Sequence, residues 1–245
     1  GTNLVEGRYS FVLTVTKDNS LTRSDTVRVV VSSRVLIDFG PDVSGNPDAG
    51  GKYWNNIANG QDGVKLSNAI TVGNAVSSIG LEIINRIDGT FNIAGAGTNT
   101  GNTTGDVGDY PSTATADFAF AHPSATNGQW KITGLDPLKQ YHIKFWGSRT
   151  GVPDARIIEI KLAEQSVWQQ YDATDNTSFT NAALFTVVNK TEAIFDIRVK
   201  DGSAFGYIDL IDIDYSVYDP GTNIPPVARA GNDKSVTLPA NSVTL

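Results

Sequence analysis

Residues 207–215 have the sequence YIDLIDIDY, and this pattern decides the fold class. From residue 211 onward, apolar side chains alternate with Asp212 and Asp214, so one face of a β-strand is apolar and the other is acidic. Residues 35–40, VLIDFG, form a second apolar strand near the start of the same region. We expect these two terminal strands to lie side by side in the core.

The same period of two recurs between these ends, whereas helical periodicity is nearly absent. Clusters of Gly, Asn and Asp separate the candidate strands, which are 79–87, 90–94, 115–120, 129–133, 141–147, 156–162, 183–188 and 193–200. Many short strands with such turns predict an all-β fold, a jelly-roll-like β-sandwich with flanking β-strand segments.

Composition narrows the possible partners and cell compartment. The net charge of −7 argues against nucleic acid, which needs clustered Lys and Arg. No stretch approaches the ~20 apolar residues of a membrane helix, so no membrane insertion is expected. The absence of Cys excludes disulfides and thiol catalysis. Together with 24 Gly residues, it favours a secreted or cell-surface bacterial protein. The absence of Met and of a signal peptide indicates a piece of a longer chain.

Both ends of the chain differ from the middle. Alternating residues 9–15 and 27–31 flank a turn at 17–20 and predict a β-hairpin. Residues 223–226, NIPP, indicate a stiff linker that leads into further strands. We therefore divide the chain into a first segment at 1–34, a β-sandwich domain at 35–218, and a linker with following strands at 219–245.

Two resemblances follow from these motifs. Residues 7–33, GRYSFVLTVTKDNSLTRSDTVRVVVSS, resemble the last two strands of a PKD-type immunoglobulin-like repeat. Residues 223–245, NIPPVARAGNDKSVTLPANSVTL, resemble the first strands of the next such repeat. This implies spacer segments of a large bacterial surface protein or polysaccharide-degrading enzyme. We expect the two fragments to pack on the middle domain, or to pair with each other within or between chains.

The middle domain contains, in this order, the motifs IDFG, YWNNI, YPSTATAD, ITGLDPLKQYHIKFWGSR and YIDLIDIDY. With these motifs it resembles a secreted bacterial β-sandwich related in shape to galactose-binding-like domains. Galactose-binding-like domains occur as carbohydrate-binding modules, so the resemblance implies a polysaccharide or glycan as partner.

Aromatic side chains are the first candidates for sugar contacts, because a sugar's apolar face stacks on a ring. Strand parity points Tyr141, Ile143 and Phe145 inward and Trp146 outward. Trp168 lies in a polar context. Trp146 and Trp168 each have two possible roles that remain open: the ring contacts a ligand, or it covers a loop.

Two other aromatic sites are placed by their sequence context. Trp130 shares its parity with Ile132 and is expected in the core. The pair at 53–54 favours a plug at one end of the sandwich over a platform for sugar, with the asparagines after it holding loop backbone.

A loop after a strand is the second source of binding groups. Arg149 offers a planar guanidinium that can grip neighbouring hydroxyls, and Asp154 follows in the same loop. The alternative is an ion pair between the two that pins the loop. The candidate ligand-binding residues are Trp146, Arg149, Trp168, Tyr171 and Asp154.

Asp212 and Asp214 share one strand face, a spacing that two glycosidase carboxylates could have. We favour the interpretation that Asp212 and Asp214 are surface charges, which pair with Lys144, Arg198 or Lys200 on neighbouring strands. No nucleophile elbow, zinc-protease His pair or phosphate-binding loop is present, so the chain is not expected to be an enzyme.

A calcium site is considered at the glycine-rich loop that holds Asp42, Asn46 and Asp48. Calcium prefers six to eight oxygen ligands, which such a loop can supply. Galactose-binding-like modules often hold a structural calcium near their first and last strands, so the resemblance supports this loop. An ordinary Asp/Asn turn is the alternative.

Two main function hypotheses follow. The first is a non-catalytic extracellular carbohydrate-binding module within a larger bacterial protein. The second is a structural spacer or adhesin module without a small ligand, which the flanking repeat fragments support. A hydrolase needs a pocket with a base near a nucleophile, and the sequence shows no sign of one.

Overall fold

The computed structural model describes residues 4, 6–17, 21–40, 44–58, 60–87, 106–123 and 127–218. The strands are β1 (Gly7–Lys17), β2 (Leu21–Val31), β3 (Ser33–Phe39), β4 (Asn55–Ile57), β5 (Lys65–Leu66), β6 (Gly80–Asn85), β7 (Ala119–Ala121), β8 (Gly128–Thr133), β9 (Lys139–Trp146), β10 (Ile157–Leu162), β11 (Gln169–Asp172), β12 (Ala183–Val188), β13 (Ala193–Val199), β14 (Gly206–Ile208) and β15 (Leu210–Val217). A short 3₁₀ helix, η1, covers Ser112–Ala114. None of the helical segments in the described part of the chain has the length and apolar character needed to span a bilayer.

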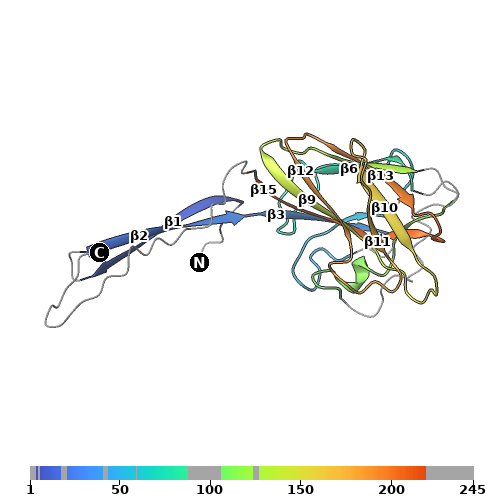
Figure 1. The fold of residues 1–245 in the computed structure, drawn as a ribbon, viewed down its shortest axis with the longest axis horizontal. Helices are drawn as coiled ribbons and strands as arrows, with labels where there is room; N and C mark the ends of the chain where they lie inside the picture. The colour runs from blue at the N-terminus through green and yellow to red at the C-terminus, as the bar shows by residue number, and fades with distance from the viewer. Residues whose placement is uncertain are drawn as a thin grey trace, which may run out of the picture.

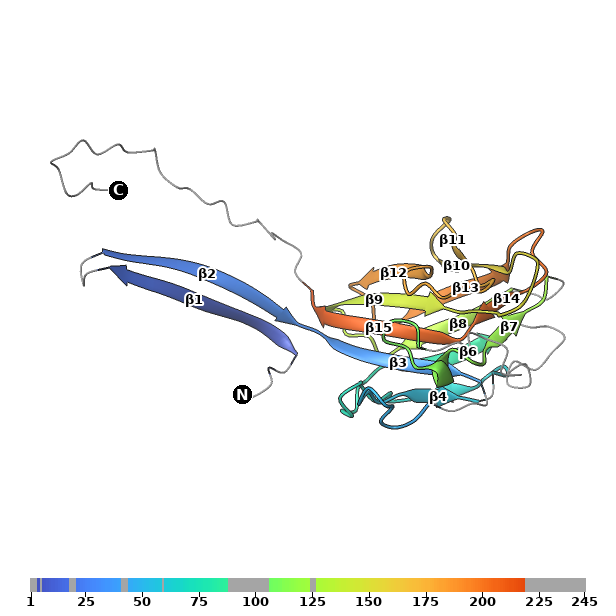
Figure 2. The same cartoon turned by 90° about the horizontal axis from the view of Figure 1, so that it is seen from below.

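Two sheets form the predicted β-sandwich (Figures 1 and 2). One has six strands in the order β11-β10-β13-β8-β6-β5, and the other has five in the order β12-β9-β15-β3-β4. The pair β14-β7 forms a small third sheet. Strand β15 pairs antiparallel with β3 along 210–215, which confirms that the two apolar terminal strands are neighbours in the core.

The space between the two large sheets holds the main core. Tyr141, Ile143 and Phe145 of β9 are buried there, as the alternation predicts. Aromatic rings stack in this layer: Phe39 lies 4.8 Å from Trp130, centroid to centroid, which confirms Trp130 as a core residue. Edge-to-face contacts between other phenylalanines add to this packing.

Strands β1 and β2 form the predicted hairpin, which extends from the sandwich as a long arm (Figure 1). At its base, Arg8 Nη2 donates to the carbonyl of Val217 at 3.3 Å, and Glu6 pairs with Lys139 at 2.7 Å. Because the arm points away from the sheets, the expectation that this fragment packs on the middle domain is wrong for most of its length. The tail at 219–245 and the candidate strand at 90–94 lie outside the described residues.

Candidate functional site

The outer face of the five-stranded sheet carries two rows of side chains that run across four strands. The register aligns Thr186, His142, Asp214 and Arg34 in one row. The next row aligns Leu184, Lys144, Asp212 and Leu36. Neighbouring strands lie about 4.8 Å apart, so each row is a continuous strip of polar and apolar groups.

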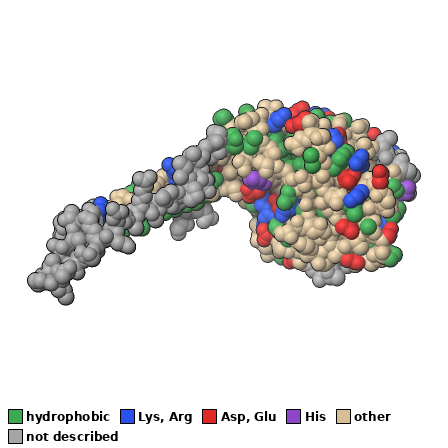
Figure 3. Space-filling model, viewed as in Figure 1, with side chains coloured by type: hydrophobic (Ala, Val, Ile, Leu, Met, Phe, Trp, Pro, Cys, Tyr) green, Lys and Arg blue, Asp and Glu red, His purple; other side chains and the backbone are tan. Residues whose placement is uncertain are grey.

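Apart from the buried Leu36, these rows form the floor of a groove of about 460 Å³, which we call the sheet groove. Phe179 and Asp109 reach its rim from two loops, and the lining comprises Arg34, Asp109, His142, Ile143, Lys144, Phe179, Leu184, Phe185, Thr186, Asp212 and Asp214. His142 is exposed and Leu184 is 55% exposed, so the groove opens to solvent. In Figure 3, Lys/Arg, Asp/Glu and His side chains gather on the sandwich near the base of the arm.

Arg34 organises one side of the sheet groove. Its Nε and Nη2 donate to the two carboxylate oxygens of Asp212 at 2.8 Å each, and its Nη1 donates to Asp109 at 2.8 Å. The Tyr110 hydroxyl donates to Asp212 as well, at 2.8 Å. Burial opposes the charge of Arg34, but the hydrogen bonds to Asp212 and Asp109 outweigh it and raise the guanidinium pKa. Burial, with the charge of Asp212, raises the pKa of Tyr110.

Lys144 is the cation of the sheet groove that remains available. Its ammonium lies 3.4 Å from the ring centroid of Phe179 and 5.7 Å from that of Tyr110, and it donates no hydrogen bond to a described residue. Burial lowers the pKa of Lys144, while the charge of Asp212 opposes this shift. Its three N–H donors can therefore serve a ligand.

His142 and the two acidic residues of β15 share this groove, but they do not form a catalytic arrangement. Within the described residues, the ring nitrogens of His142 contact Gln140 at 2.6 Å and Thr186 at 3.3 Å. Asp212 is saturated by Arg34 and Tyr110, and Asp214 accepts from Ser32 at 3.0 Å. Two of the predicted partners of Asp212 are wrong, because Arg198 on β13 and Lys200 after it belong to the other large sheet. There Arg198 pairs with Glu159, and Lys200 donates to Gln170. Lys144 does lie opposite it in the register, but the ion pair forms with Arg34.

Trp146 points outward, as its parity predicts, but a second layer covers it completely. This layer consists of loop residues on the outer face of the sheet, and the buried cluster comprises Leu36, Trp54, Val107, Tyr110, Ala114, Trp146 and Leu210. The indole of Trp146 donates to the carbonyl of Ser178 at 2.9 Å. Of the two alternatives for Trp146, the structure supports packing against loops. The prediction of a ligand contact is wrong, because the ring is 0% exposed.

The stretch at 53–57 is buried as a plug would be, but Trp54 packs in the layer outside the five-stranded sheet and not at an end of the sandwich. Trp54 is 1% exposed and meets Tyr110 edge-on at 6.4 Å. Asn55 holds loop backbone, because its Nδ2 donates to the carbonyls of Leu36 and Ile70 at 2.9 Å each. The indole is therefore part of the buried outer layer and offers no platform to a sugar.

The other predicted ligand residues do not meet at one place. Trp168 lies on the outer face of the six-stranded sheet, where the centre of its ring is 4.1 Å from Cζ of Arg198. Tyr171 is buried, and its hydroxyl donates to the carbonyl of Tyr207 at 2.5 Å, so it cannot reach a ligand.

Arg149 and Asp154 are close to the small β14-β7 sheet. Arg149 lies 6.0 Å from the ring of Phe118. Asp154 pairs with Arg156 at 2.8 Å. This differs from the predicted alternative, which was an ion pair between Asp154 and Arg149. Neither residue lines the sheet groove.

The loop considered for calcium instead holds Trp54. The side chain of Asn46 accepts from Trp54 N and donates to Trp54 O at 2.9 Å. Asp48 accepts from the indole at 2.8 Å and from Lys52 N at 2.9 Å, and Asp42 lies outside the described residues. No group of three or more His, Asp or Glu side chains suited to a metal ion occurs in the described ranges. Calcium binding stays a prediction.

Three carboxylates outside the predicted site residues are buried at the other end of β3 and β15. Asp38, Asp117 and Asp209 are 1%, 0% and 0% exposed. Both oxygens of Asp209 accept from Ser148 N, at 3.1 and 3.0 Å. Burial raises the pKa of Asp209 well above its usual range, and the nearby Asp117 and Asp38 raise it further.

This raised pKa has a consequence for stability. The folded state holds the Asp209 proton more tightly than the unfolded state, so its contribution is present at low pH and is lost as pH rises from about 3.9 towards the folded pKa. We expect Asp209→Asn to reduce the fall in melting temperature between about pH 5 and about pH 8. Thermal unfolding at several pH values measures this. The exposed Asp201→Asn serves as control, and an equal pH dependence in wild type and Asp209→Asn would contradict the assignment.

Comparison with known proteins finds distant similarities in structure. No family model matches the chain, and no curated protein matches it. Bacteroides uniformis β-glucuronidase 2 is similar in structure at 7% identity with a TM-score of 0.42, over 84% of this chain and 22% of that one. A CBM35 from Cellvibrio japonicus aligns at 15% identity, TM-score 0.30, over 51% of this chain and 89% of that one. An F5/8 type C domain from Bacteroides fragilis aligns at 14%, TM-score 0.26, over 58% and 93%.

Proposed function

We propose that the sandwich is a non-catalytic glycan-binding module and that the sheet groove is its binding site. The observation that carries the proposal is the Lys144 ammonium, which is half-buried beside Phe179 and donates no hydrogen bond to a described residue. A polar group with open donors on a partly apolar wall is typical of a small-ligand site.

The groove offers the two kinds of contact that a sugar ring requires. Phe179 and Leu184 supply apolar surface for the C–H face of the ring. Lys144, Thr186 and Asp214 supply donors and acceptors for hydroxyl groups. The volume of about 460 Å³ falls within the range of ligand pockets.

The state of the acidic residues supports binding without hydrolysis. Glycoside hydrolysis needs one carboxylic acid and one free carboxylate on opposite sides of the scissile bond. In the sheet groove, Asp212 is occupied by Arg34 and Tyr110, and Asp109 pairs with Arg34. Asp214 alone supplies no such pair.

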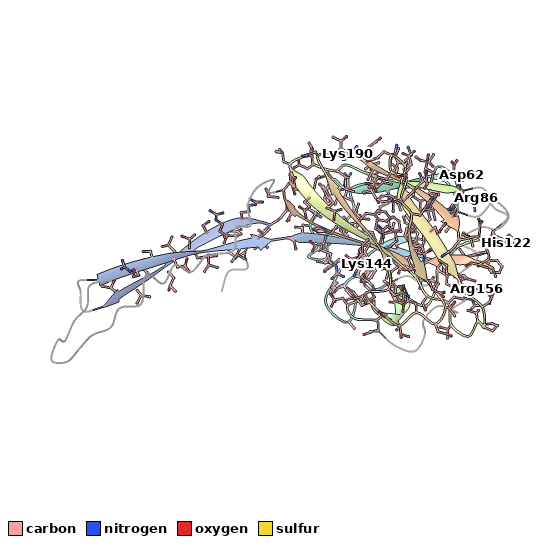
Figure 4. The ribbon with its side chains drawn as sticks, in the orientation of Figure 1. Asp62, Arg86, His122, Lys144, Arg156 and Lys190 are labelled. Carbon is pink, nitrogen blue, oxygen red and sulfur yellow. The ribbon has the colours of Figure 1, made fainter. Side chains whose placement is uncertain are left out.

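Affinity electrophoresis through gels that contain soluble polysaccharides tests the proposal. We expect one class of polysaccharide to retard the wild-type protein, and Lys144→Ala to lose at least about tenfold in affinity, because a charged hydrogen bond contributes about 1.5–3 kcal/mol. Lys190→Ala is the matched control, since Lys190 is exposed and pairs with Glu164 on another part of the surface (Figure 4). Failure of every common polysaccharide class to retard the protein would contradict the proposal.

The arm favours a second candidate, a structural spacer or adhesin module without a small ligand. A long two-stranded extension is a device for joining one domain to the next, and both candidates fit a larger bacterial protein. For either function we propose a site of action outside the cell, as in the bacterial surface proteins whose repeats the flanking segments resemble. If the protein is only a spacer, we expect no polysaccharide to retard it in the gels.

A further inference from the structure

A second groove adjoins the sheet groove. It has a volume of about 380 Å³ and is lined by residues from the stretches 45–52 and 106–113, and we call it the loop groove. Asp109 lines both grooves. The two grooves therefore meet at one residue, and a ligand longer than the sheet groove can reach the loop groove across Asp109.

A tight turn forms the boundary between the grooves. Val107 and Tyr110 exchange both backbone hydrogen bonds, at 2.9 and 3.0 Å, so the two residues between them stand at the tip of the turn. A Cβ atom on Gly108 would lie 2.6 Å from the ring of Phe179, which lines the sheet groove, whereas Gly108 itself lines the loop groove. This close packing fixes the turn, and Asp109 with it, between the two grooves.

Cations from both grooves hold Asp109 in place. Arg34 of the sheet groove donates to its Oδ2 at 2.8 Å, and Lys52 of the loop groove lies 3.8 Å from its Oδ1. The hydrogen bond from Arg34 lowers the pKa of Asp109 against the effect of burial, so the group is a carboxylate at neutral pH. The side chain is still 54% exposed. A ligand that crosses from one groove to the other therefore meets a fixed acceptor for its hydroxyl groups.

The loop groove has hydrogen-bonding groups that are still available within the described part of the chain. The Lys52 ammonium makes one long hydrogen bond, of 3.4 Å, to a backbone carbonyl, and the Ser112 hydroxyl makes none to a described residue. Asp106 accepts from Ser112 N at 3.0 Å with one of its two carboxylate oxygens. Pro47 and Pro111 add apolar surface. These groups can bind the hydroxyls of a sugar and cover part of its C–H surface.

The charges of the loop groove favour an uncharged ligand. Its described lining has the carboxylates of Asp48, Asp106 and Asp109 against the ammonium of Lys52. A carboxylate or sulfate group on a sugar would meet like charges here, whereas a sugar hydroxyl can donate to them. The net charge of −7 on the whole chain acts in the same direction.

We propose that the loop groove is a second subsite for the glycan that the sheet groove binds, and that this glycan is a chain of uncharged sugar units that crosses at Asp109. The inference rests on the proposed function and adds the ligand class to it. Once one unit occupies the sheet groove, the linked units reach the loop groove at a high effective concentration. Affinity should therefore rise with the length of the chain.

Affinity as a function of chain length tests this inference. Mono- to hexasaccharides are prepared from mannan, galactan and mixed-linkage β-glucan, and isothermal titration calorimetry gives their dissociation constants with the full-length chain. In the series that binds, we expect the hexasaccharide to bind at least about tenfold more tightly than the disaccharide. Oxidation of the primary hydroxyl groups of this hexasaccharide to carboxylates should remove the gain, because it places like charges in the loop groove.

Two double variants locate the gain. Lys52→Ala with Ser112→Ala removes the available donors of the loop groove and should bring the hexasaccharide close to the affinity of the disaccharide. Lys190→Ala with Ser166→Ala is the matched control, because both residues are exposed and neither lines one of the two grooves. This control should keep the full gain.

The outcomes separate this inference from the proposed function. A hexasaccharide that binds no more tightly than the disaccharide, while Lys144→Ala weakens both, would overturn the second subsite and leave the sheet groove as the binding site. A gain that survives in Lys52→Ala with Ser112→Ala, or that survives oxidation of the sugar, would also overturn the inference. Absence of binding in all three series would overturn it too, and retardation in the polysaccharide gels then decides separately whether the proposed function fails.

Discussion

Replacement of Trp54 by alanine is expected to lower the free energy of unfolding by about 3–5 kcal/mol. The indole is 1% exposed and fills the outer layer between Leu36 and Tyr110. Its removal leaves a cavity in a layer that the loops cannot readily collapse. It also takes from Asp48 the indole hydrogen bond of 2.8 Å, one of the contacts that hold the pKa of Asp48 below its usual value against the effect of burial. Urea unfolding measures this loss. We expect the slope of the unfolding free energy against urea concentration to be the same in the variant and the wild type.

Trp168→Ala is the control for this prediction. Trp168 is a ring of the same size, but it is only partly buried and lies on Arg198 at the surface of the other sheet. We expect a cost of about 1 kcal/mol or less. Equal losses in the two variants would mean that Trp54 does not close the layer as described.

Replacement of Asp212 by alanine is expected to cost about 3–5 kcal/mol as well, because it leaves a buried charge without its partner. Arg34 then keeps only Asp109, which is half exposed, and the buried Tyr110 hydroxyl loses its acceptor. The side chains of Arg34 and Asp212 are 18% and 8% exposed, so water compensates little. Chemical unfolding of the single variants measures the cost.

Two further variants separate the charge effect from a general effect on the strand. Asp214→Ala lies two residues away on the same face and breaks only the hydrogen bond from Ser32, so we expect a cost of about 1 kcal/mol or less. The double variant Arg34→Met with Asp212→Leu removes both charges and should be more stable than Asp212→Ala. If Asp212→Ala were no more harmful than Asp214→Ala, the ion pair would have no structural role.

Period-two alternation was sufficient to predict most of the sandwich. It located β9, β12 and β13 within two residues at each end, and it placed the side chains of β9 on the correct faces. The short strands β4 and β5 were missed, because three and two residues are too few to show a period. Strand β11 was missed for a similar reason, since its sequence QQYD is mostly polar.

The candidate site was harder to predict, because alternation tells which face a side chain occupies and not what covers that face. Trp146 and Lys144 share the outer face of β9, yet loops seal Trp146 and leave Lys144 beside a groove. The partners that cause this difference, Tyr110 and Phe179, come from loops distant in sequence. Arg34 gave no signal either, since its pairing with Asp212 depends on the register of β3 and β15.

The most direct test of the account is to map the glycan contact by amide chemical shifts. A polysaccharide or oligosaccharide that retards the protein is titrated into labelled full-length protein, and shifts are followed in two-dimensional NMR spectra. We expect the largest shifts on the outer face of the five-stranded sheet, at 142–144, 184–186 and 212–214, with none around Trp168. Shifts that centre on Trp168 or Arg149 and leave the sheet groove unchanged would contradict the assignment of the site.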